Sequence, residues 1–236
     1  MDKIELKPKT EGVFQKFFWV VTHRPNQVWK MGRGYLLFEW SRLWRPIVLG
    51  QSDQIRLGRN VRIQRNFSLS AERPHGRISI GDHSILYENA QVESYGLGRV
   101  DIGPCCILGD TRIYSRATVR LGARVVSSWN VLIQDFDSHP IDPDERALQI
   151  ESLCARFRPG QWESEQGVFP RDSNWSFPGR AIEIGDDVWI GANSTILKGA
   201  RVGRGCLIAA GAVLPGGEYP PRSLIAGNPA RVVKSL

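Results

Sequence analysis

Aliphatic residues recur at every sixth position near the C-terminal end of the chain. The aliphatic positions are Ile184, Ile190, Ile196, Val202, Ile208 and Leu214. The residue four places after each of the first five is small or β-branched: Val188, Ser194, Ala200, Cys206 and Ala212. A period of six fits neither the 3.6-residue repeat of a helix nor the two-residue alternation of a strand. It is typical of a solenoid in which each hexapeptide forms one short strand and a turn.

The same period continues upstream with interruptions. Inward positions are expected at Leu57, Ile63, Leu69, Ile80, Leu86, Val92, Ile102, Leu108 and Tyr114 and, after a one-residue slip, at Leu121, Ser127 and Ile133. Register is least defined between residues 108 and 130, where Arg112 and Ser127 are poor inward residues. The alternative is a β-sandwich of many short strands, which need not keep a constant spacing. The constant period therefore predicts an all-β solenoid.

Two segments of the chain lack the period. Residues 1–50 interleave aromatic with basic side chains, and Gly34–Arg45 has the spacing of an amphipathic helix. This segment is either a helical or irregular cap over the open strand edges of the first coil, which we favour, or an interfacial helix on an anionic membrane. Residues 140–181 form a long inserted loop. Such loops are usually functional or disordered, and the aromatic residues of this one argue against disorder. The expected organisation is a cap segment, 1–50, and a solenoid domain, 51–236, whose C-terminal tail covers 217–236.

Composition restricts the partners and the compartment. The formal net charge is +7, which suits nucleic acid, an anionic membrane surface or a phosphorylated small molecule. No common nucleic-acid-binding motif occurs and the arginines are scattered, so we expect no nucleic-acid partner. The four cysteines form no CxxC pair, and Cys106 and Cys206 fall on inward positions, which suits a reducing compartment. The polar start of the chain does not read as a signal peptide. A cytoplasmic protein is expected.

Three motifs carry a family resemblance. They are IEIGDDVWIGANSTILKGARVGRGCLIAAGAVL, YPPRSLIAGNPARVVK and, upstream, NVLIQDFDSHPIDP. They resemble the hexapeptide-repeat acyltransferases, most closely the galactoside, maltose and nodulation-factor O-acetyltransferase group, over about residues 55–236. The resemblance implies a left-handed parallel β-helix, a homotrimer, and acetyl transfer from acetyl-CoA at clefts between neighbouring subunits. The insertion is much longer than in the small-sugar members, which suggests a larger acceptor.

Acyl transfer to an alcohol or amine needs a base and donors for the developing oxyanion, but neither a metal nor a covalent intermediate. His139 suits proton transfer near neutral pH, and the resemblance matches it to the catalytic histidine. Asp137 is expected to orient the imidazole, as a carboxylate does in a triad. We interpret Asp135 as a residue that caps or solvates its turn. A metal site at DFDSH is disfavoured because no second ligand cluster accompanies it.

Donor-binding residues are expected in the last coils. The small residues Ala192, Ala210 and Gly211 allow close approach of a pantetheine arm, and the resemblance matches the two alanines to donor contacts. It also matches Arg231 and Lys234 to basic residues that meet the CoA phosphates, a charge-assisted contact. One donor contact is absent or replaced, because the family's Thr-Lys pair is missing after Leu214.

Acceptor-binding candidates are Asn130 and Asp110, about one coil before His139, and Trp175 in the insertion. Together these features predict an acetyl-CoA-dependent O-acetyltransferase acting on a sugar hydroxyl. The larger acceptor suggests a polysaccharide precursor, lipid-linked at the inner face of a membrane, where the protein would be peripheral. The alternatives are an N-acetyltransferase acting on an amino sugar and a non-catalytic solenoid scaffold.

Overall fold

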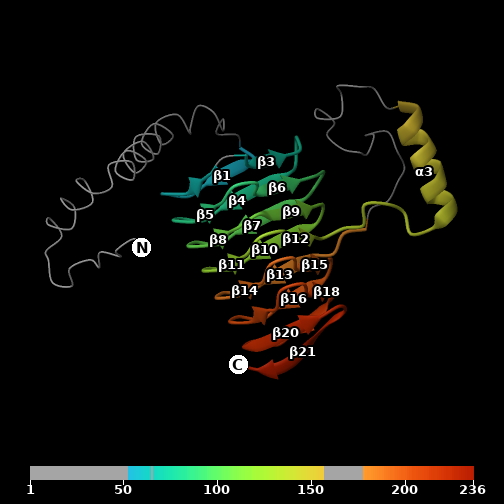
Figure 1. The fold of residues 1–236 in the computed structure, drawn as a ribbon. Helices are drawn as coiled ribbons and strands as arrows, with labels where there is room; N and C mark the ends of the chain where they lie inside the picture. The colour runs from blue at the N-terminus through green and yellow to red at the C-terminus, as the bar shows by residue number, and fades with distance from the viewer. Residues whose placement is uncertain (1–52, 65, 157–177) are drawn as a thin grey trace, which may run out of the picture. The chain divides into compact units, whose positions relative to one another are not determined.

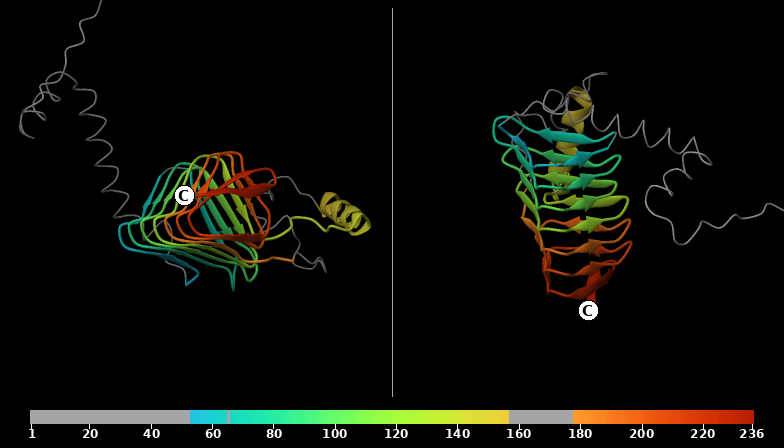
Figure 2. Two further views of the ribbon diagram at one scale, coloured as in Figure 1. Left: turned by 90° about the horizontal axis from the view of Figure 1, so that it is seen from below. Right: turned by 90° about the vertical axis from the view of Figure 1, so that its left-hand side faces the viewer.

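The structure, a computed structural model, describes residues 53–64, 66–156 and 178–236, which lie in one compact unit, Ser52–Leu236. The described chain is a parallel β-solenoid of about seven turns, and the view along its axis shows three flat faces (Figures 1 and 2). The predicted β-helix of hexapeptide repeats is therefore confirmed. The cap segment 1–50 lies outside the described residues.

Each of the first six coils contributes a strand to each of three sheets, and the last coil contributes to sheets A and B alone. Sheet A contains, in spatial order, β1 (Ile55–Leu57), β4 (Arg77–Ile80), β7 (Arg99–Ile102), β10 (Thr118–Leu121), β13 (Ile182–Ile184), β16 (Ala200–Val202) and β19 (Gly217–Tyr219). Sheet B contains β2 (Arg62–Ile63), β5 (Ile85–Leu86), β8 (Ile107–Leu108), β11 (Val126–Ser127), β14 (Trp189–Ile190), β17 (Leu207–Ile208), β20 (Ser223–Gly227) and β21 (Ala230–Ser235). Sheet C contains β3 (Ser68–Ala71), β6 (Gln91–Ser94), β9 (Thr111–Ser115), β12 (Val131–Gln134), β15 (Thr195–Leu197) and β18 (Val213–Leu214).

The interior is filled by the residues that the six-residue period selects. All six aliphatic positions of the C-terminal run are buried, as are the five small or β-branched residues between them. Parallel pairing stacks each inward residue on its counterpart in the next coil, for example Ile133 on Ile196 and Ile196 on Leu214. The turns where the three sheets meet form three edges, which we call the A–B, B–C and C–A edges.

The structure corrects the register near residue 114. Ile113, not Tyr114, points into the core, because the turn between β8 and β9 has only two residues, Gly109 and Asp110. Tyr114 lies outside, and its hydroxyl donates to Oε1 of Gln91 at 2.6 Å. Ser127 is inward as predicted, and its hydroxyl lies 2.6 Å from Thr111 Oγ1, which satisfies both buried groups.

The structure also differs from the expectations for the C-terminal tail and for the insertion. Residues after Leu214 do not leave the solenoid as a tail: β19 and β20 form a seventh coil, and β21 returns antiparallel to β20. The insertion is not wholly irregular, because α3 (Pro143–Arg156) forms directly after His139. Helix α3 lies beside the coils, outside the three-faced stack (Figure 2). Residues 157–177 of the insertion lie outside the described residues.

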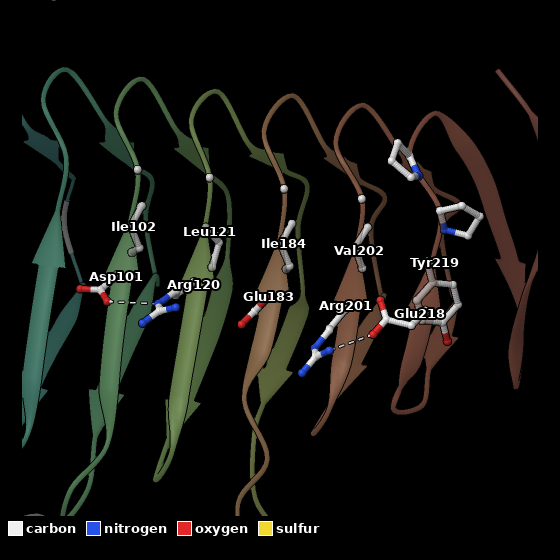
Figure 3. A pocket seen from close by; sticks show the side chains of 16 residues that line it. Asp101, Ile102, Arg120, Leu121, Glu183, Ile184, Arg201, Val202, Glu218 and Tyr219 are labelled. Atoms are coloured by element: carbon white, nitrogen blue, oxygen red, sulfur yellow. Dashed lines mark hydrogen bonds and ion pairs between the residues drawn. The ribbon is translucent and has the colours of Figure 1, made fainter.

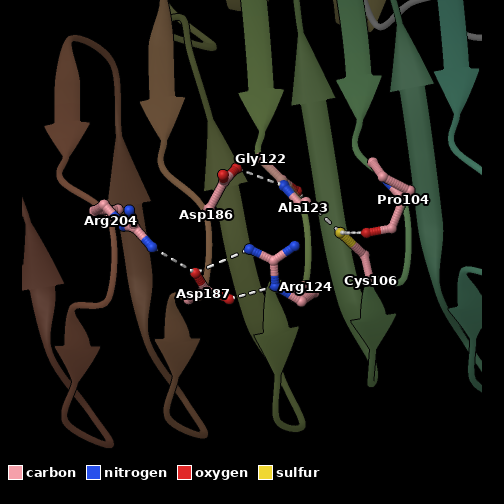
Figure 4. A network of polar contacts seen from close by, with 8 residues as sticks. All are labelled: Pro104, Cys106, Gly122, Ala123, Arg124, Asp186, Asp187 and Arg204. Carbon is pink, nitrogen blue, oxygen red and sulfur yellow. Dashed lines mark hydrogen bonds and ion pairs between the residues drawn. The ribbon is translucent and has the colours of Figure 1, made fainter.

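Charged side chains connect neighbouring coils along the A–B edge (Figure 4). Arg124 donates to both carboxylate oxygens of Asp187 at 2.5 and 3.0 Å, and Arg204 of the following coil reaches the same carboxylate at 3.3 Å. Hydrogen bonding from Arg124 lowers the pKa of Asp187. Asp186 accepts a hydrogen bond from the Ala123 amide at 2.8 Å. These contacts bridge the coils on either side of the insertion, so the insertion does not interrupt the stack.

Candidate active site

His139 lies just beyond the end of β12, where the chain leaves the solenoid at the C–A edge. Its side chain is exposed, yet one ring nitrogen is fixed: Nδ1 lies 2.9 Å from Oε1 of Gln149 in α3. The other ring nitrogen has no hydrogen bond within the described structure. An exposed imidazole held at one nitrogen is the arrangement that a general base requires.

Asp135 anchors the segment that carries His139. Its carboxylate is fully buried and accepts hydrogen bonds from Ser115 Oγ at 2.6 Å and from the amides of Arg116 and Ala117 at 2.8 and 3.1 Å. Burial raises the pKa of Asp135, although these hydrogen bonds oppose the shift. Asp135 therefore caps a turn, but that of the preceding coil rather than its own, and it joins the end of β12 to that turn.

Asp137 does not contact His139 in the structure. Its carboxylate forms an ion pair with Lys198, which directly follows β15 in the next coil. Both side chains are about three-quarters buried. The predicted role of Asp137 in orienting the imidazole therefore has no geometric support here, since Gln149 occupies the position beside Nδ1. Neither Gln149 nor Lys198 was singled out from the sequence.

An aromatic cluster supports the same segment from the preceding coils. The rings of Tyr95 and Phe136 meet edge to face, with centroids 6.1 Å apart. The guanidinium carbon of Arg116 lies 5.5 and 5.2 Å from these two ring centroids, within cation–π range. Burial lowers the pKa of Arg116. Phe136, which lies in the sequence between the two aspartates, is itself buried, so this cluster packs against the segment leading to His139.

Helix α3 is held against the residues that follow His139. Asp142 caps its start, with Oδ1 accepting from the amides of Asp144 and Glu145 at 3.0 Å each. Arg146 reaches back, and its Nη1 donates to the carbonyls of Pro140 and Ile141, both at 2.9 Å. The cap and the arginine fix the helix relative to the candidate base.

The predicted donor residues stack along the B–C edge. The Gly211 amide donates to the carbonyl of Ala192 at 2.8 Å, so these two turns lie directly one above the other. Gly211 has φ +73°, and a Cβ on it would meet open space, while Ala210 beside it is exposed. These turns carry only small side chains, and the space beyond Gly211 is open, so an elongated ligand could lie against them.

Asn130 continues this edge in the preceding coil. Its Nδ2 donates to Oδ1 of Asn193 at 2.8 Å, and its Oδ1 accepts from Arg112 at 2.6 Å. Asp110 lies one coil further, half-buried in the two-residue turn, and its carbonyl accepts from the Val131 amide at 3.0 Å. The candidate Trp175 lies outside the described residues.

The basic candidates Arg231 and Lys234 lie on β21 and are both exposed. Arg231 Nη1 donates to the carbonyl of Ala230 at 2.9 Å. Among the described residues, no group of three or more His, Cys, Asp or Glu side chains could hold a metal ion. No helix in the described part of the chain is long and apolar enough to cross a membrane.

Within one chain, the candidate base and the donor edge lie apart. The B–C edge precedes each strand of sheet C, and the C–A edge follows it; β15 (Thr195–Leu197) thus lies between Asn193 at the B–C edge and Lys198 at the C–A edge. At about 3.3 Å per residue, a strand and its flanking residues separate the two edges by about 13–16 Å. The chain therefore does not bring His139 next to Ala192 or Ala210.

A groove of about 680 Å³ follows sheet A (Figure 3). Its outward side chains alternate in charge from coil to coil: Asp101, Arg120, Glu183, Arg201 and Glu218. Arg201 pairs with Glu218 at 3.0 Å, and Arg120 with Asp101 at 3.9 Å. None of the candidate catalytic, donor-binding or acceptor-binding residues lines this groove, and its charges neutralise one another along the stack.

Comparison with known proteins agrees with this fold. A family model described as bacterial transferase hexapeptide (six repeats) matches residues 181–216. The described solenoid superposes on AntD, an N-acyltransferase from Bacillus cereus solved with dTDP and coenzyme A, with a TM-score of 0.55 at 19% identity, covering 76% of this chain and 83% of that one. The chain carries hexapeptide repeats of bacterial transferases on a β-helix shared with that enzyme.

Two sequence relatives are described as acetyltransferases. Rv3034c of Mycobacterium tuberculosis, described as a probable acetyltransferase, is 27% identical over 219 residues, which cover 92% of this chain and 61% of the relative. A 2,3,4,5-tetrahydropyridine-2,6-dicarboxylate N-acetyltransferase of Staphylococcus aureus is 51% identical over 53 residues, 22% of each chain. The chain thus spans about three-fifths of the length of its mycobacterial relative.

Proposed function

We propose that the protein is an acetyl-CoA-dependent O-acetyltransferase that acetylates a sugar hydroxyl of a saccharide or polysaccharide precursor. The observation that carries the proposal is His139, an exposed imidazole fixed at one nitrogen and placed at the edge of a hexapeptide solenoid. The acetyltransferase relatives support the reaction class.

The chemistry is direct transfer in a ternary complex. The free ring nitrogen of His139 takes the proton of the acceptor hydroxyl while the hydroxyl oxygen attacks the thioester carbonyl carbon. The carbon–sulfur bond then breaks, and the protonated imidazole returns its proton to the CoA sulfur. Lys198 lies in the next coil, with its charge already balanced by Asp137, so we assign it no proton transfer.

Acetyl-CoA is proposed to lie along the B–C edge. The bare turns at Ala192, Ala210 and Gly211 suit a pantetheine arm, and Arg231 and Lys234 supply positive charge on the last strand for the CoA phosphates. AntD, which shares the fold, was solved with coenzyme A. Asn130, Asp110 and Trp175 remain the candidates for acceptor contacts.

A homotrimer would bring the base to the donor. Because the two edges lie apart in one chain, a neighbouring subunit must supply one of them, as predicted from the family resemblance. An apolar stripe on the outer face of sheet B suits the subunit interface: Ile85, Ile107, Val126, Trp189, Leu207 and Leu224, one per coil. Trp189 is 51% exposed in the single chain, and exposed apolar patches of this kind mark interaction surfaces.

The second candidate is an N-acetyltransferase acting on an amino sugar. AntD is an N-acyltransferase, also solved with dTDP-4-amino-4,6-dideoxyglucose, and the Staphylococcus aureus relative is an N-acetyltransferase. The same base and donor edge serve an amine nucleophile. Matched acceptors that differ only in carrying a hydroxyl or an amine at one carbon separate the two activities.

The acceptor is proposed to be larger than a free sugar, because the insertion adds α3 beside the base. A lipid-linked precursor would place the protein in the cytoplasm at the inner face of a membrane, with residues 1–50 either capping the solenoid or contacting the bilayer. Binding of the full chain and of a chain lacking residues 1–50 to anionic vesicles compares these two roles.

The donor assignment is tested by calorimetry of acetyl-CoA binding to the wild type and to the Arg231→Ala/Lys234→Ala variant. Binding in the micromolar range that the double substitution weakens at least tenfold is the expected result. Arg201→Ala, an exposed arginine on sheet A, is the matched control and should bind like the wild type. Absence of binding at millimolar acetyl-CoA would instead favour a scaffold.

A further inference from the structure

The side chain that contacts the candidate base comes from the insertion, not from the DFDSH motif. Gln149 lies in the second turn of α3, ten residues after His139, and its side chain is 1% exposed. The only polar contact of its amide within the described structure is the one to Nδ1 of His139, at 2.9 Å. A buried amide whose one polar contact is to an exposed imidazole can fix the orientation of that imidazole.

The chemistry of this contact determines where the histidine proton sits. An amide oxygen only accepts hydrogen bonds, so Nδ1 of His139 must be the donor when Oε1 of Gln149 faces it. In the neutral ring, Nε2 then carries the lone pair. With the amide reversed, its NH₂ group would donate to Nδ1, the proton would sit on Nε2, and the outer nitrogen could not accept a proton from an acceptor hydroxyl.

The second polar atom of the same amide supports a functional role. Nε2 of Gln149 is buried and has no hydrogen-bond partner among the residues that the structure describes. A buried donor left unpaired is costly, and such groups require a reason beyond stability. An aliphatic side chain at this position would avoid that cost but could not fix the imidazole.

The segment between His139 and Gln149 is short and is held by hydrogen bonds. Arg146 lies one helical turn before Gln149 on the same face of α3, and it binds the carbonyls of Pro140 and Ile141, the residues directly after His139. Asp142 caps the start of the helix. The candidate base and its partner are therefore only ten positions apart in the chain, and four hydrogen bonds hold the segment between them.

We propose that Gln149 is the positioning residue of this site: it holds His139 in the Nδ1–H tautomer and leaves Nε2 as the base for acyl transfer. The role in catalysis rests on the proposed function, but the tautomer itself does not. Asp137, engaged by Lys198, then contributes to the position of the loop rather than to the state of the ring.

The tautomer is measured directly by long-range ¹H–¹⁵N NMR of the histidine rings at a pH where they are neutral. The His139→Ala spectrum assigns the His139 signals among the four histidines of the chain. We expect wild-type His139 to show a protonated Nδ1 and an unprotonated Nε2. Gln149→Leu should give the mixture of tautomers of a free imidazole, while Gln149→Glu, which keeps an acceptor oxygen, should preserve the wild-type pattern. An unprotonated Nδ1 in the wild type, or an unchanged pattern in Gln149→Leu, would overturn the proposal.

Steady-state kinetics test whether Gln149 contributes to acetyl transfer through its contact with His139. Gln149→Leu should lower kcat about 100-fold, the effect of a misplaced catalytic group, with little change in KM for acetyl-CoA, and Gln149→Glu should recover most of the loss. Glu151→Leu, an exposed position on the same helix, is the matched control and should behave as wild type. Wild-type kcat in Gln149→Leu would also overturn the positioning role. If the wild type transfers no acetyl group but shows the expected tautomers, the proposed function fails while the positioning of His139 by Gln149 stands.

Discussion

Replacing Asp135 by alanine is expected to destabilise the solenoid, because the carboxylate is the acceptor for three donors at the C–A edge. Ser115 Oγ is buried and lies 2.6 Å from the carboxylate, and it also lies 3.1 Å from the Arg99 carbonyl, so the variant loses a charge-assisted hydrogen bond, worth about 1.5–3 kcal/mol, without leaving the hydroxyl unpaired. The amides of Arg116 and Ala117 belong to half-buried residues that water can partly reach, so each adds about 0.5–1 kcal/mol. Relief of the buried charge offsets part of the total, which leaves a loss of about 2–4 kcal/mol.

The assay is denaturant unfolding followed by far-UV circular dichroism at one fixed protomer concentration, because assembly would otherwise contribute to the apparent stability. Asp137→Ala is the matched control, from the same motif but with a partly exposed ion pair, and it should cost about 1 kcal/mol or less. Equal losses for the two variants, or a loss below about 1 kcal/mol for Asp135→Ala, would refute the assignment of Asp135 as the anchor.

Two other predictions concern pH and assembly. Burial raises the pKa of Asp135 in the folded protein above the ordinary 3.8. Protonation of Asp135 therefore stabilises the folded state. This stabilisation is complete at pH values below the ordinary pKa, and it is lost as the pH rises through the raised pKa of the folded protein. Asp135→Asn, which cannot ionise, should remove this step from a plot of unfolding free energy against pH, and an unchanged step would assign it to another group. Trp189→Glu should convert the proposed trimer to monomers in sedimentation velocity, because it places a charge in the apolar stripe, while Arg120→Glu on sheet A should not. A trimeric Trp189→Glu variant would locate the interface elsewhere.

The repeat was predictable because core packing imposes it at every coil. A solenoid side chain that points inward has no alternative environment, so Ile184, Ile196 and Leu214 reveal their burial through spacing alone. The register error at Tyr114 has a local cause. The turn at Gly109 and Asp110 is shortened, and a turn of different length shifts the inward position by one residue without changing composition.

The site was less predictable because it depends on contacts between coils and with the insertion. Asp135 and Asp137 are two residues apart, yet one is turned into the solenoid toward Ser115 and the other outward toward Lys198. The start of α3 did have a signal in Asp142 followed by Pro143, an N-cap and a first-turn proline. That signal predicts a helix but not that Gln149 faces His139, which depends on how the helix packs.

The proposed arrangement of the active site follows from the distance between the B–C and C–A edges. Sheet C keeps the candidate base at one edge and the proposed donor turns at the other, so under the proposed function neither edge alone could carry out acyl transfer. The proposed assembly explains why an exposed apolar stripe and an exposed imidazole occur on the same solenoid.

The central claim, that His139 is the base of an acetyltransferase, is tested most directly by thiol release from acetyl-CoA in the presence of a panel of hexoses and nucleotide-linked amino sugars. The account predicts acceptor-dependent release by the wild type and a loss of at least 1,000-fold in His139→Ala, with acetyl-CoA binding by calorimetry unchanged. Full activity in His139→Ala, with an intact fold, would contradict it.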